Sequence, residues 1–513
     1  MTIDTRNSPL VILGIDSADP GLLARWTREG YLPTLAAVMQ RGCWGTIESA
    51  EQVTEQGTEL SLFSGVSRAR HGYYHFRQLK TGTYDLQAFS PWDTNVLPFW
   101  THLRGTGKQA AVIDAAEARP VKGLPGLQLL NWATHQPAIP TLPPAAEPAA
   151  LLDDARRLFG PQMFISEFKL NSSIAEDRRA RRRFLERIEK KGRLCRALLA
   201  RDRFDLIVIE FFEAHTGGHR FWQHRPELQA GGTPDGELTH AIRELYQAID
   251  RQLGLILAEL PGAANVVIYS PYGMWDTYPT GGLLEDFCRQ LGYQAAPQPA
   301  APSLTPTARL RRALPESARL AISHRLPKRV QERLLVDGFR ASANWPATTA
   351  FAIPGLYTGF VFVNLRGRGP QGTVEPGRDY EAVLDRLEAD LTQLTDPHTG
   401  KPAIRRIART VEAFGGGPPV QTPDLFVEWE PGRHFVERVM HPRAALTQQR
   451  PGYYRGSYHS FKGFVIAAGP AVKARGAIGR VSLLDLAPTF LTLLGESVPP
   501  EMTGQVMGAM ISG

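Results

Sequence analysis

Two histidines, His215 and His219, stand directly after an apolar stretch of the chain. Residues 205–212 (DLIVIEFF) are almost unbroken in their apolar character and include β-branched residues, which is typical of a strand buried on both faces of a parallel sheet. The carboxyl ends of such strands hold the ligands of open α/β sheets. The two imidazoles could therefore bind a metal ion or a substrate. Two surface histidines in a loop are the open alternative, since Gly217 and Gly218 argue against a rigid helical turn.

Asp16 occupies a comparable position earlier in the chain. It ends the apolar segment 9–16 (PLVILGID), and a helical stretch with its own start signal follows it. An acid at the end of the first parallel strand often handles a metal or a phosphate group. A cap on the following helix is the competing interpretation of Asp16.

His215, His219 and Asp16 can meet only if the strands before them end at the same edge of one sheet. The pattern of apolar segments along the chain predicts such a sheet. Apolar strands alternate with helices, which predicts an α/β fold with a doubly wound, mostly parallel sheet. The expected strands lie near 9–15, 109–114, 205–212, 265–270 and 463–468, and the expected helices near 97–104, 178–200, 236–259, 281–291 and 482–494.

Four segments are expected along the chain. Residues 1–291 form the first part of an α/β core, and residues 431–513 return to it. Residues 292–345 are rich in Pro, Ala and Arg and interrupt the pattern, so they indicate a basic helical insertion that acts as a lid or as a contact between copies in a homo-oligomer. Residues 346–430 carry their own strands and a helix (379–394), which predicts a smaller α+β cap over the active-site side.

The overall composition is that of a globular protein, with 43% hydrophobic and 21% charged residues. No run of about 18 apolar residues occurs, and no basic and then apolar leader opens the chain. We therefore expect a cytoplasmic protein without a membrane partner. The three cysteines, Cys43, Cys195 and Cys288, are odd in number and widely spaced, which argues against a disulfide framework and a cysteine metal site.

The net charge of +7 is concentrated in residues 178–193 and 309–335. Both segments have apolar residues at helical spacing, so they predict amphipathic helices with solvated basic faces. Aromatic residues that could stack on bases are not interleaved with the charges, so we expect no nucleic-acid partner. A basic rim that attracts a small anionic substrate is the alternative interpretation.

Several motifs match one family in order along the chain. They begin with GIDSADPGLLARWTREGYLPTLAAVMQRGCWGTIES (14–49) and SGVSRARHGYYHF (64–76), and continue with DLIVIEFFEAHTGGHRFW (205–222), VVIYSPYGM (266–274), residues 360–383, TPDLFVEW (422–429), GSYHSFKGFVIAAGP (456–470) and residues 482–507. The sequence resembles the alkaline phosphatase superfamily, in its type I phosphodiesterase/nucleotide pyrophosphatase branch. The resemblance implies an alkaline-phosphatase type of α/β fold and two divalent metals beside a phosphoryl group.

The resemblance also assigns ligands. Asp16 matches the first-strand aspartate of one metal site, while His219 and His459 match two histidines of the other. His215 stands where the family usually has an aspartate. The family's S-D-H-G-M appears here as SPYGM, in which Pro271 offers no donor atom and Tyr272 binds a metal only as a phenolate, from a pKa of about 10. We therefore expect Asp16 to be left nearly alone, the second metal to be absent, and a single tri-histidine site to remain.

The position of the family's nucleophile is less defined. Counting back from Ser64-Gly65 reaches Glu55, and a one-residue slip reaches Thr54, which could equally be a helix N-cap. Glu55 and Glu59 could supply a missing carboxylate ligand or a general base. Arg455 and Tyr272 are candidates for contact with an anionic substrate, Tyr458 lies beside His459, and His71 occupies a structural position.

Glu210 and Glu213 flank the histidine pair, and either could orient a ligating imidazole or bind the metal.

Three functions remain open at this point. The first is a metal-dependent hydrolase of a phosphate ester or a related anionic small molecule, with one divalent ion. Zinc suits three imidazoles with an open fourth position, and iron, copper or manganese are further possibilities. The second is a repurposed mononuclear metalloenzyme that catalyses a non-phosphoryl reaction on a specialised metabolite, and the third is a non-catalytic pseudo-phosphatase that binds a ligand or a partner.

Overall fold

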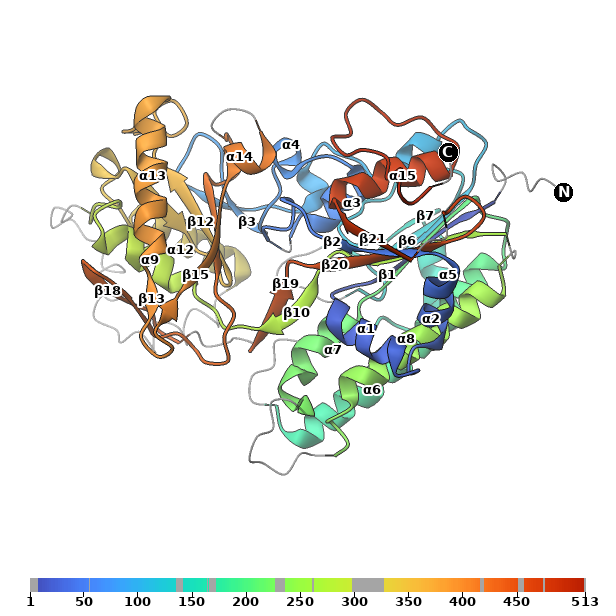
Figure 1. Ribbon diagram of the computed structural model, residues 1–513. Coiled ribbons are helices and arrows are strands. Elements are labelled where there is room, and N and C mark those ends of the chain that lie inside the picture. Colours follow the sequence, from blue (N-terminus) through green and yellow to red (C-terminus); the bar gives the residue numbers. More distant parts are fainter. Residues whose placement is uncertain are drawn as a thin grey trace.

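The chain folds into a large α/β core and a smaller cap lobe built on antiparallel sheets, on the right and the left of Figure 1. The computed structural model describes residues 8–54, 56–134, 142–163, 165, 172–226, 236–260, 263–297, 327–415, 419–450, 456–473 and 476–511.

The first strand, β1 (Leu10–Ile15), shows why the core sheet lies between two layers of helices. All of its residues are buried. Val11, Leu13 and Ile15 belong to the hydrophobic cluster on one face of the sheet, whereas Leu10 and Ile12 belong to the cluster on the other. Because side chains alternate across a strand, an apolar residue at every position requires apolar cover on both faces.

The core sheet has the order β21-β2-β20-β9-β1-β8-β5-β6-β7 in the described part of the chain. Strands β8 and β9 flank β1, and both pair with it in parallel. The sequence pattern groups 463–468 with the parallel strands, but β20 runs antiparallel to both of its neighbours. β7 is antiparallel to β6, so the sheet is mostly parallel, as expected. The bounds are β2 Cys43–Ile47, β5 Ala110–Ile113, β6 Gly126–Leu130, β7 Ala145–Glu147, β8 Leu206–Phe211, β9 Asn265–Ser270, β20 Gly463–Ala468 and β21 Gly476–Val481.

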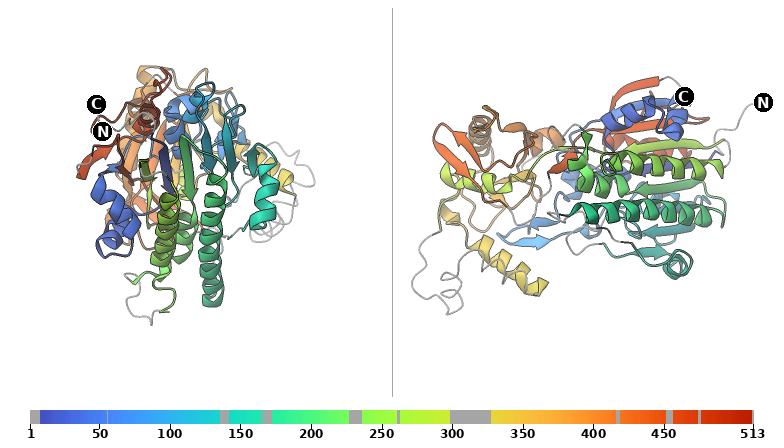
Figure 2. Two further views of the ribbon diagram at one scale, coloured as in Figure 1. Left: turned by 90° about the vertical axis from the view of Figure 1, so that its right-hand side faces the viewer. Right: turned by 90° about the horizontal axis from the view of Figure 1, so that it is seen from below.

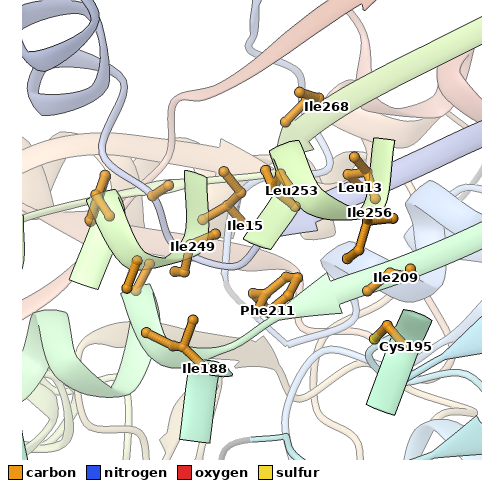
Figure 3. Close-up of a cluster of buried hydrophobic side chains, with 14 of the residues drawn as sticks. Leu13, Ile15, Ile188, Cys195, Ile209, Phe211, Ile249, Leu253, Ile256 and Ile268 are labelled. Carbon is orange, nitrogen blue, oxygen red and sulfur yellow. The ribbon is translucent and has the colours of Figure 1, made fainter. Parts of the chain in front are cut away.

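Helices cover both faces of this sheet (Figure 2). Figure 3 shows one face, where Leu13 and Ile209 of the sheet lie against Ile188, Leu253 and their neighbours from two long helices. The helices of this face are α1 Pro20–Arg28, α2 Pro33–Arg41, α5 Leu151–Phe159, α6 Ile174–Leu199 and α8 Ala241–Ala258, and those of the other are α3 Thr58–Ser64, η3 Phe99–Leu103, η7 Leu483–Asp485 and α15 Leu486–Leu493. The remaining short elements of the core are α4 Arg68–His71, β3 Arg77–Leu79, β4 Leu86–Ala88, η2 Pro91–Asp93 and η4 Trp222–His224.

Helix α6 corresponds to the first basic segment, but its charges are not all solvated. Arg187 and Lys191 are both buried. Arg187 pairs with Glu213 at 2.6 Å, and Lys191 pairs with Asp114 at 2.8 Å. The interpretation of 178–193 as a helix with a solvated basic face is thus confirmed for its exposed arginines, Arg179, Arg182, Arg183 and Arg193, whereas Arg187 and Lys191 satisfy buried acids.

The cap lobe contains the sheets β11-β12-β16-β15 and β14-β13-β17-β18. Its hydrophobic cluster includes residues of α9 and of β17 and β18, which lie outside the range 346–430 expected for the cap. Most of the basic insertion, 298–326, lies outside the described residues, and with it most of the expected oligomer contact. The bounds are α9 Gly281–Gln290, α12 Lys328–Arg340, η6 Trp345–Ala347, β11 Ala350–Ile353, β12 Thr358–Val363, α13 Arg378–Thr392, β13 Thr395–Asp396, β14 Lys401–Pro402, β15 Ile404–Arg409, α14 Thr410–Phe414, β16 Leu425–Trp429, β17 Arg438–His441 and β18 Ala444–Thr447.

Two expectations from composition can be compared with the fold. Cys43, Cys195 and Cys288 are buried and form no disulfide. Among the helices in the described ranges, none combines the length and the apolar character that crossing a membrane requires.

The histidine pair lies on a helix, contrary to the expectation from its glycines. Helix α7 (Glu213–Phe221) carries both His215 and His219. A Cβ atom on Gly217 would lie 2.2 Å from Leu245 Cδ1 of α8, and one on Gly218 would lie 2.7 Å from Met274 Sδ. The glycines therefore allow side chains to pack closely on two sides of α7, and that packing offsets their low helix propensity.

Substituting Gly217→Ala tests this explanation. The new methyl group overlaps the buried Leu245 side chain, so we expect the free energy of unfolding to fall by about 1–3 kcal/mol. In a Leu245→Ala background the overlap disappears, and Gly217→Ala should become neutral or stabilising by up to about 1 kcal/mol. Urea unfolding of the four proteins measures the coupling.

The matched control is Gly338→Ala in α12, where a Cβ atom meets no heavy atom within 4 Å. It should be neutral or stabilising on its own. A destabilisation by Gly217→Ala that persists in the Leu245→Ala background would contradict the packing explanation.

Candidate functional site

The topology of the core sheet brings distant residues to one edge. Asp16 follows β1, α7 follows β8, and Pro271 follows β9, so all three leave the carboxyl ends of adjacent parallel strands. β20 runs the opposite way, and its first residue therefore lies at the same edge. The strand before it, β19 (Ser457–Ser460), pairs antiparallel with β10 (Gly273–Asp276), which sets Met274 opposite His459.

Three histidines meet at this edge. His215, His219 and His459 each offer a ring nitrogen, and these atoms lie within 4.8 Å of one another. Their ring centroids are 4.6–5.0 Å apart, with interplanar angles of 66–89°. The rings therefore do not stack but approach a common centre from three directions. All three are buried, with exposures of 3%, 6% and 0%.

The outward nitrogen of each imidazole contacts an oxygen of the chain. His215 Nδ1 lies 2.7 Å from Asp16 Oδ2, His219 Nδ1 lies 3.1 Å from Ser457 Oγ, and His459 Nδ1 lies 3.1 Å from Ser17 Oγ. The Nε2 atoms of His219 and His459 are 3.3 Å apart. A hydrogen bond at Nδ1 directs the other ring nitrogen, Nε2, toward the centre, which is the arrangement that metal-binding histidines use.

Asp16 contacts this cluster through a hydrogen bond, although it is not among the side chains close enough to share an ion in the described part of the chain. Besides His215 it accepts a hydrogen bond from Ser17 Oγ at 3.1 Å. The two acids expected to orient an imidazole point elsewhere. Glu213 pairs with Arg187, and Glu210 accepts hydrogen bonds from Tyr269 Oη at 2.9 Å and from the Ala116 N–H at 2.7 Å.

Two buried carboxyl groups, those of Glu59 and Glu210, lie near Asp16. Burial, followed by the nearby charge of Asp16, raises the pKa of Glu210 to about 8 and raises the pKa of Glu59 well above its ordinary value. Glu210 and Tyr269 lie on either side of Gly14 in the sheet register, and a Cβ on Gly14 would be 2.7 Å from Glu210 Cγ. Gly14 therefore leaves the space in which Glu210 and Tyr269 meet.

The loop that was expected to carry the nucleophile precedes α3. Thr54 is buried, and its carbonyl oxygen accepts a hydrogen bond from Thr58 Oγ1 at 2.8 Å. Thr54 is not the helix N-cap, because that position belongs to Gly57. Glu55 lies outside the described residues. Glu59 lies in the first turn of α3, is buried, and its Oε1 has no hydrogen-bond partner in the described part of the chain.

Sequence reasoning did not identify two residues that fix this loop. Glu117 accepts hydrogen bonds from the N–H groups of Gly57 and Leu60 at the start of α3. The fully buried Arg68 donates to the carbonyl oxygens of Glu51, Thr54, Gln56 and Tyr73. A polar residue after β5 was the available signal for Glu117, while nothing local distinguishes Arg68 from the other arginines of SRARHG.

His71 has the structural role expected of it. Its Nδ1 accepts from the Tyr73 N–H at 3.1 Å, so its Nε2 donates to Ser61 Oγ at 2.9 Å, and Ser61 in turn donates to Glu51. Burial lowers the pKa of His71 well below its ordinary value. Ser61 gives its proton to Glu51 and not to the imidazole, so this chain of side chains does not activate a nucleophile.

The residues expected to bind substrate are placed only in part. The Tyr272 ring lies edge-on to His459 at 4.6 Å, and Arg455 lies outside the described residues. Tyr458 stacks on Tyr357 at 4.0 Å and 11°, which joins the core to the loop before β12 of the cap.

The raised pKa of Glu210 predicts a pH dependence of stability. The unfolded chain loses this proton near pH 4.5, but the folded protein keeps it to about pH 8. The folded state therefore binds the proton more tightly, and the Glu210 contribution to stability is complete below pH 4.5 and is lost as the pH rises to about 8. Glu210→Gln mimics the protonated carboxyl, so its free energy of unfolding should decline less over this range.

Urea unfolding between pH 5 and pH 9 measures this difference, with the exposed Glu259→Gln as a control that should follow the wild type. Parallel curves for the wild type and Glu210→Gln would contradict the assignment.

Comparison with solved structures agrees with the observed architecture. The phosphonoacetate hydrolase of Sinorhizobium meliloti 1021 matches in complexes with phosphonoformate and with phosphonoacetate, at 14% and 15% identity, with TM-scores of 0.50 and 0.51 over 95% of this chain and 96% of that one. Human ectonucleotide pyrophosphatase/phosphodiesterase 5 matches at 12% identity, with a TM-score of 0.47 over 97% of both chains. The likeness to the hydrolase, at 14–15% identity, concerns the fold alone.

No curated protein sequence gives a significant match to the chain. The family model described as type I phosphodiesterase/nucleotide pyrophosphatase matches residues 10–454, which include β1, α7 and all of the cap elements from α9 to β18. The chain therefore belongs to the type I phosphodiesterase/nucleotide pyrophosphatase family, within the alkaline phosphatase superfamily.

Proposed function

We propose that the protein is a metal-dependent hydrolase that acts on a phosphate ester or a related small anion, such as a phosphonate, with one divalent ion held by His215, His219 and His459. The observation that carries this proposal is the approach of three buried imidazoles to one centre, each with its Nδ1 against an oxygen. Membership of a phosphodiesterase family and the fold likeness to a phosphonoacetate hydrolase support the substrate class.

The donor set fits a zinc-like ion, and iron, copper or manganese are also compatible with imidazole ligands. The three imidazole ligands are neutral, so they do not offset the positive charge of the ion. A divalent ion held there would act as a Lewis acid on a phosphoryl oxygen. Burial and the nearby charge of Asp16 raise the pKa of both Glu59 and Glu210 in the metal-free protein.

A single ion is proposed because the residues for a second are missing. Pro271 and Tyr272 stand where the family places an aspartate and a histidine. In the described ranges, the three histidines are the one group of at least three His, Cys, Asp or Glu side chains close enough to hold an ion. Thr54, Glu55 and Glu59 remain candidates for the nucleophile or for proton transfer, Arg455 and Tyr272 for substrate contact, and a cytoplasmic location is part of the proposal.

The same substitutions support a second candidate function. A tri-histidine ion without an established phosphoryl nucleophile could serve a non-phosphoryl reaction on a specialised metabolite. The two candidates share the metal site, and the substrate separates them.

Metal content tests the shared site. Wild-type protein, stripped with a chelator and reconstituted with zinc, iron(II), copper(II) or manganese(II), should retain about one ion per chain after desalting, measured by plasma mass spectrometry. Alanine at His215, His219 or His459 should abolish retention, because each removes one of three ligands. The exposed His240→Ala is the matched control and should retain the ion. Two tightly bound ions, or retention by the ligand variants, would contradict the single tri-histidine site.

Turnover tests the reaction class. Hydrolysis of a panel of phosphomonoesters, diesters, nucleotides and phosphonates, followed as the phosphate, alcohol or nucleoside monophosphate that each substrate releases, should be detectable in the reconstituted protein. It should fall by more than about 100-fold in His219→Ala, since loss of a ligand exceeds the 10–100-fold cost of losing a residue that only orients one. One bound ion without hydrolysis of any member would favour the second candidate.

A further inference from the structure

Asp16 and its neighbour Ser17 connect two of the three imidazoles. Asp16 Oδ2 lies 2.7 Å from His215 Nδ1, and Asp16 Oδ1 accepts from Ser17 Oγ at 3.1 Å. The same Ser17 oxygen lies 3.1 Å from His459 Nδ1. Since the single Ser17 proton goes to Asp16, His459 must donate its Nδ1 proton to Ser17. The Asp16 carboxylate thus accepts a hydrogen bond from His215 directly, and it is linked to His459 through the Ser17 hydroxyl group.

This arrangement is incompatible with Asp16 acting as a ligand of the ion. The two nitrogens of an imidazole point to opposite sides of the ring, so an ion bound at His215 Nε2 lies across the ring from Asp16. A ligand role for Asp16 would also require giving up a short, charge-assisted hydrogen bond in a buried site, where both partners are nearly inaccessible to water.

The backbone of Ser17 supplies an independent observation. Its φ is +56°, in the left-handed region where an L residue other than glycine is uncommon and costs on the order of 1 kcal/mol. Glycine would fit this conformation without strain. Ser17 is completely buried between Asp16 and His459, so its hydroxyl group is what a glycine would lack.

We propose that Asp16 and Ser17 are positioning residues, which hold His215 and His459 with Nδ1 protonated so that their Nε2 atoms face one divalent ion, and that Asp16 does not bind the ion. This inference rests on the proposed function, and it deepens it by replacing the metal-ligand role that the family resemblance gives Asp16. The ligands of the ion are then three imidazoles, two of which are oriented by the Asp16 carboxylate, one directly and one through Ser17.

Ser17→Gly separates the positioning role from a structural one. The substitution relieves the backbone strain but also removes a buried hydroxyl group from Asp16 and His459, and because these two effects oppose each other the thermal midpoint should change little. Affinity for zinc, measured by competition with a chromophoric chelator, should nevertheless fall about 10–100-fold, the usual cost of losing a residue that orients a ligating histidine. The control is Asn131→Gly, which relieves a similar φ of +57° on a different strand end. It should leave zinc affinity unchanged.

Unchanged zinc affinity in Ser17→Gly would overturn the positioning role of Ser17. The role of Asp16 is decided by a crystal structure of the zinc-bound wild type. Both Asp16 oxygens should lie beyond bonding distance of the ion, with Oδ2 still on His215 Nδ1. An Asp16 oxygen within about 2.0–2.2 Å of the zinc would overturn the inference while leaving the metal site itself intact.

A wild-type protein that binds no metal would refute the proposed function, and a metal-free measurement then decides the inference. In metal-free protein labelled with ¹⁵N-histidine, NMR should show His215 protonated at Nδ1, and Asp16→Ala should shift it toward the Nε2-protonated form that a free histidine side chain favours. An Nε2-protonated His215 in the wild type would overturn the inference.

Discussion

The contact between Asp16 and His215 links the two central strands of the sheet at the point where their chemistry begins. A carboxylate buried to this degree is stable only if hydrogen bonds replace the water it has lost. Asp16 obtains them from His215 and Ser17, which fixes the imidazole, the turn after β1 and, through Ser17, His459. The close approach of α7 to β10 and α8, made possible by Gly217 and Gly218, is what brings His215 within reach.

Helix α6 supplies buried cations that pair with acids next to the site. Glu213 begins α7, and its pairing with Arg187 at 2.6 Å anchors that helix from the side away from the histidines. Lys191 pairs with Asp114, which follows β5, and its ammonium group also lies over the rings of Phe211 and Phe212. Removing one partner from such a buried pair leaves an unpaired charge, which costs about 3–5 kcal/mol. The basic character of α6 thus serves the architecture of the sheet edge as well as the surface.

The strands and helices of the core can be predicted well from the sequence. Strands such as 206–211 and 265–270 are fully buried and carry apolar residues on both faces, a short and nearly continuous apolar pattern that is typical of a central strand. The sequence also selects the three histidines, two from their place after a strand and His459 from a motif. Helix α7 was missed because glycine propensity is a local property, whereas the contacts of Gly217 and Gly218 are tertiary. The antiparallel direction of β20 was missed for a related reason, since periodicity carries no information about strand direction.

Residue roles were harder to predict than residue identities. Glu210 and Glu213 are the acids nearest to the histidines in sequence, but side chains at the end of a strand and at the start of a helix point in different directions, toward Tyr269 and Arg187. Asp16, about 200 positions away, is the acid that contacts an imidazole. Spacing along the chain could not reveal this, because the contact is made by the parallel pairing of β1 and β8, which sets Ile15 beside Phe211.

The parallel pairing of β1 and β8 also determines the charges of the buried carboxyl groups near the histidines. Glu59, Glu210 and Asp16 face one another in a region from which water is excluded, and they cannot all be ionised there. Asp16 has an imidazole N–H and a hydroxyl to stabilise its charge, whereas Glu59 Oε1 has no partner in the described ranges, so the proton is better held by Glu59 and Glu210. One carboxylate and three neutral imidazoles then leave a bound divalent ion with a net positive charge. The site as proposed would favour an incoming anion, and the neutral His215, at the position where the resemblance places an aspartate, would strengthen that preference.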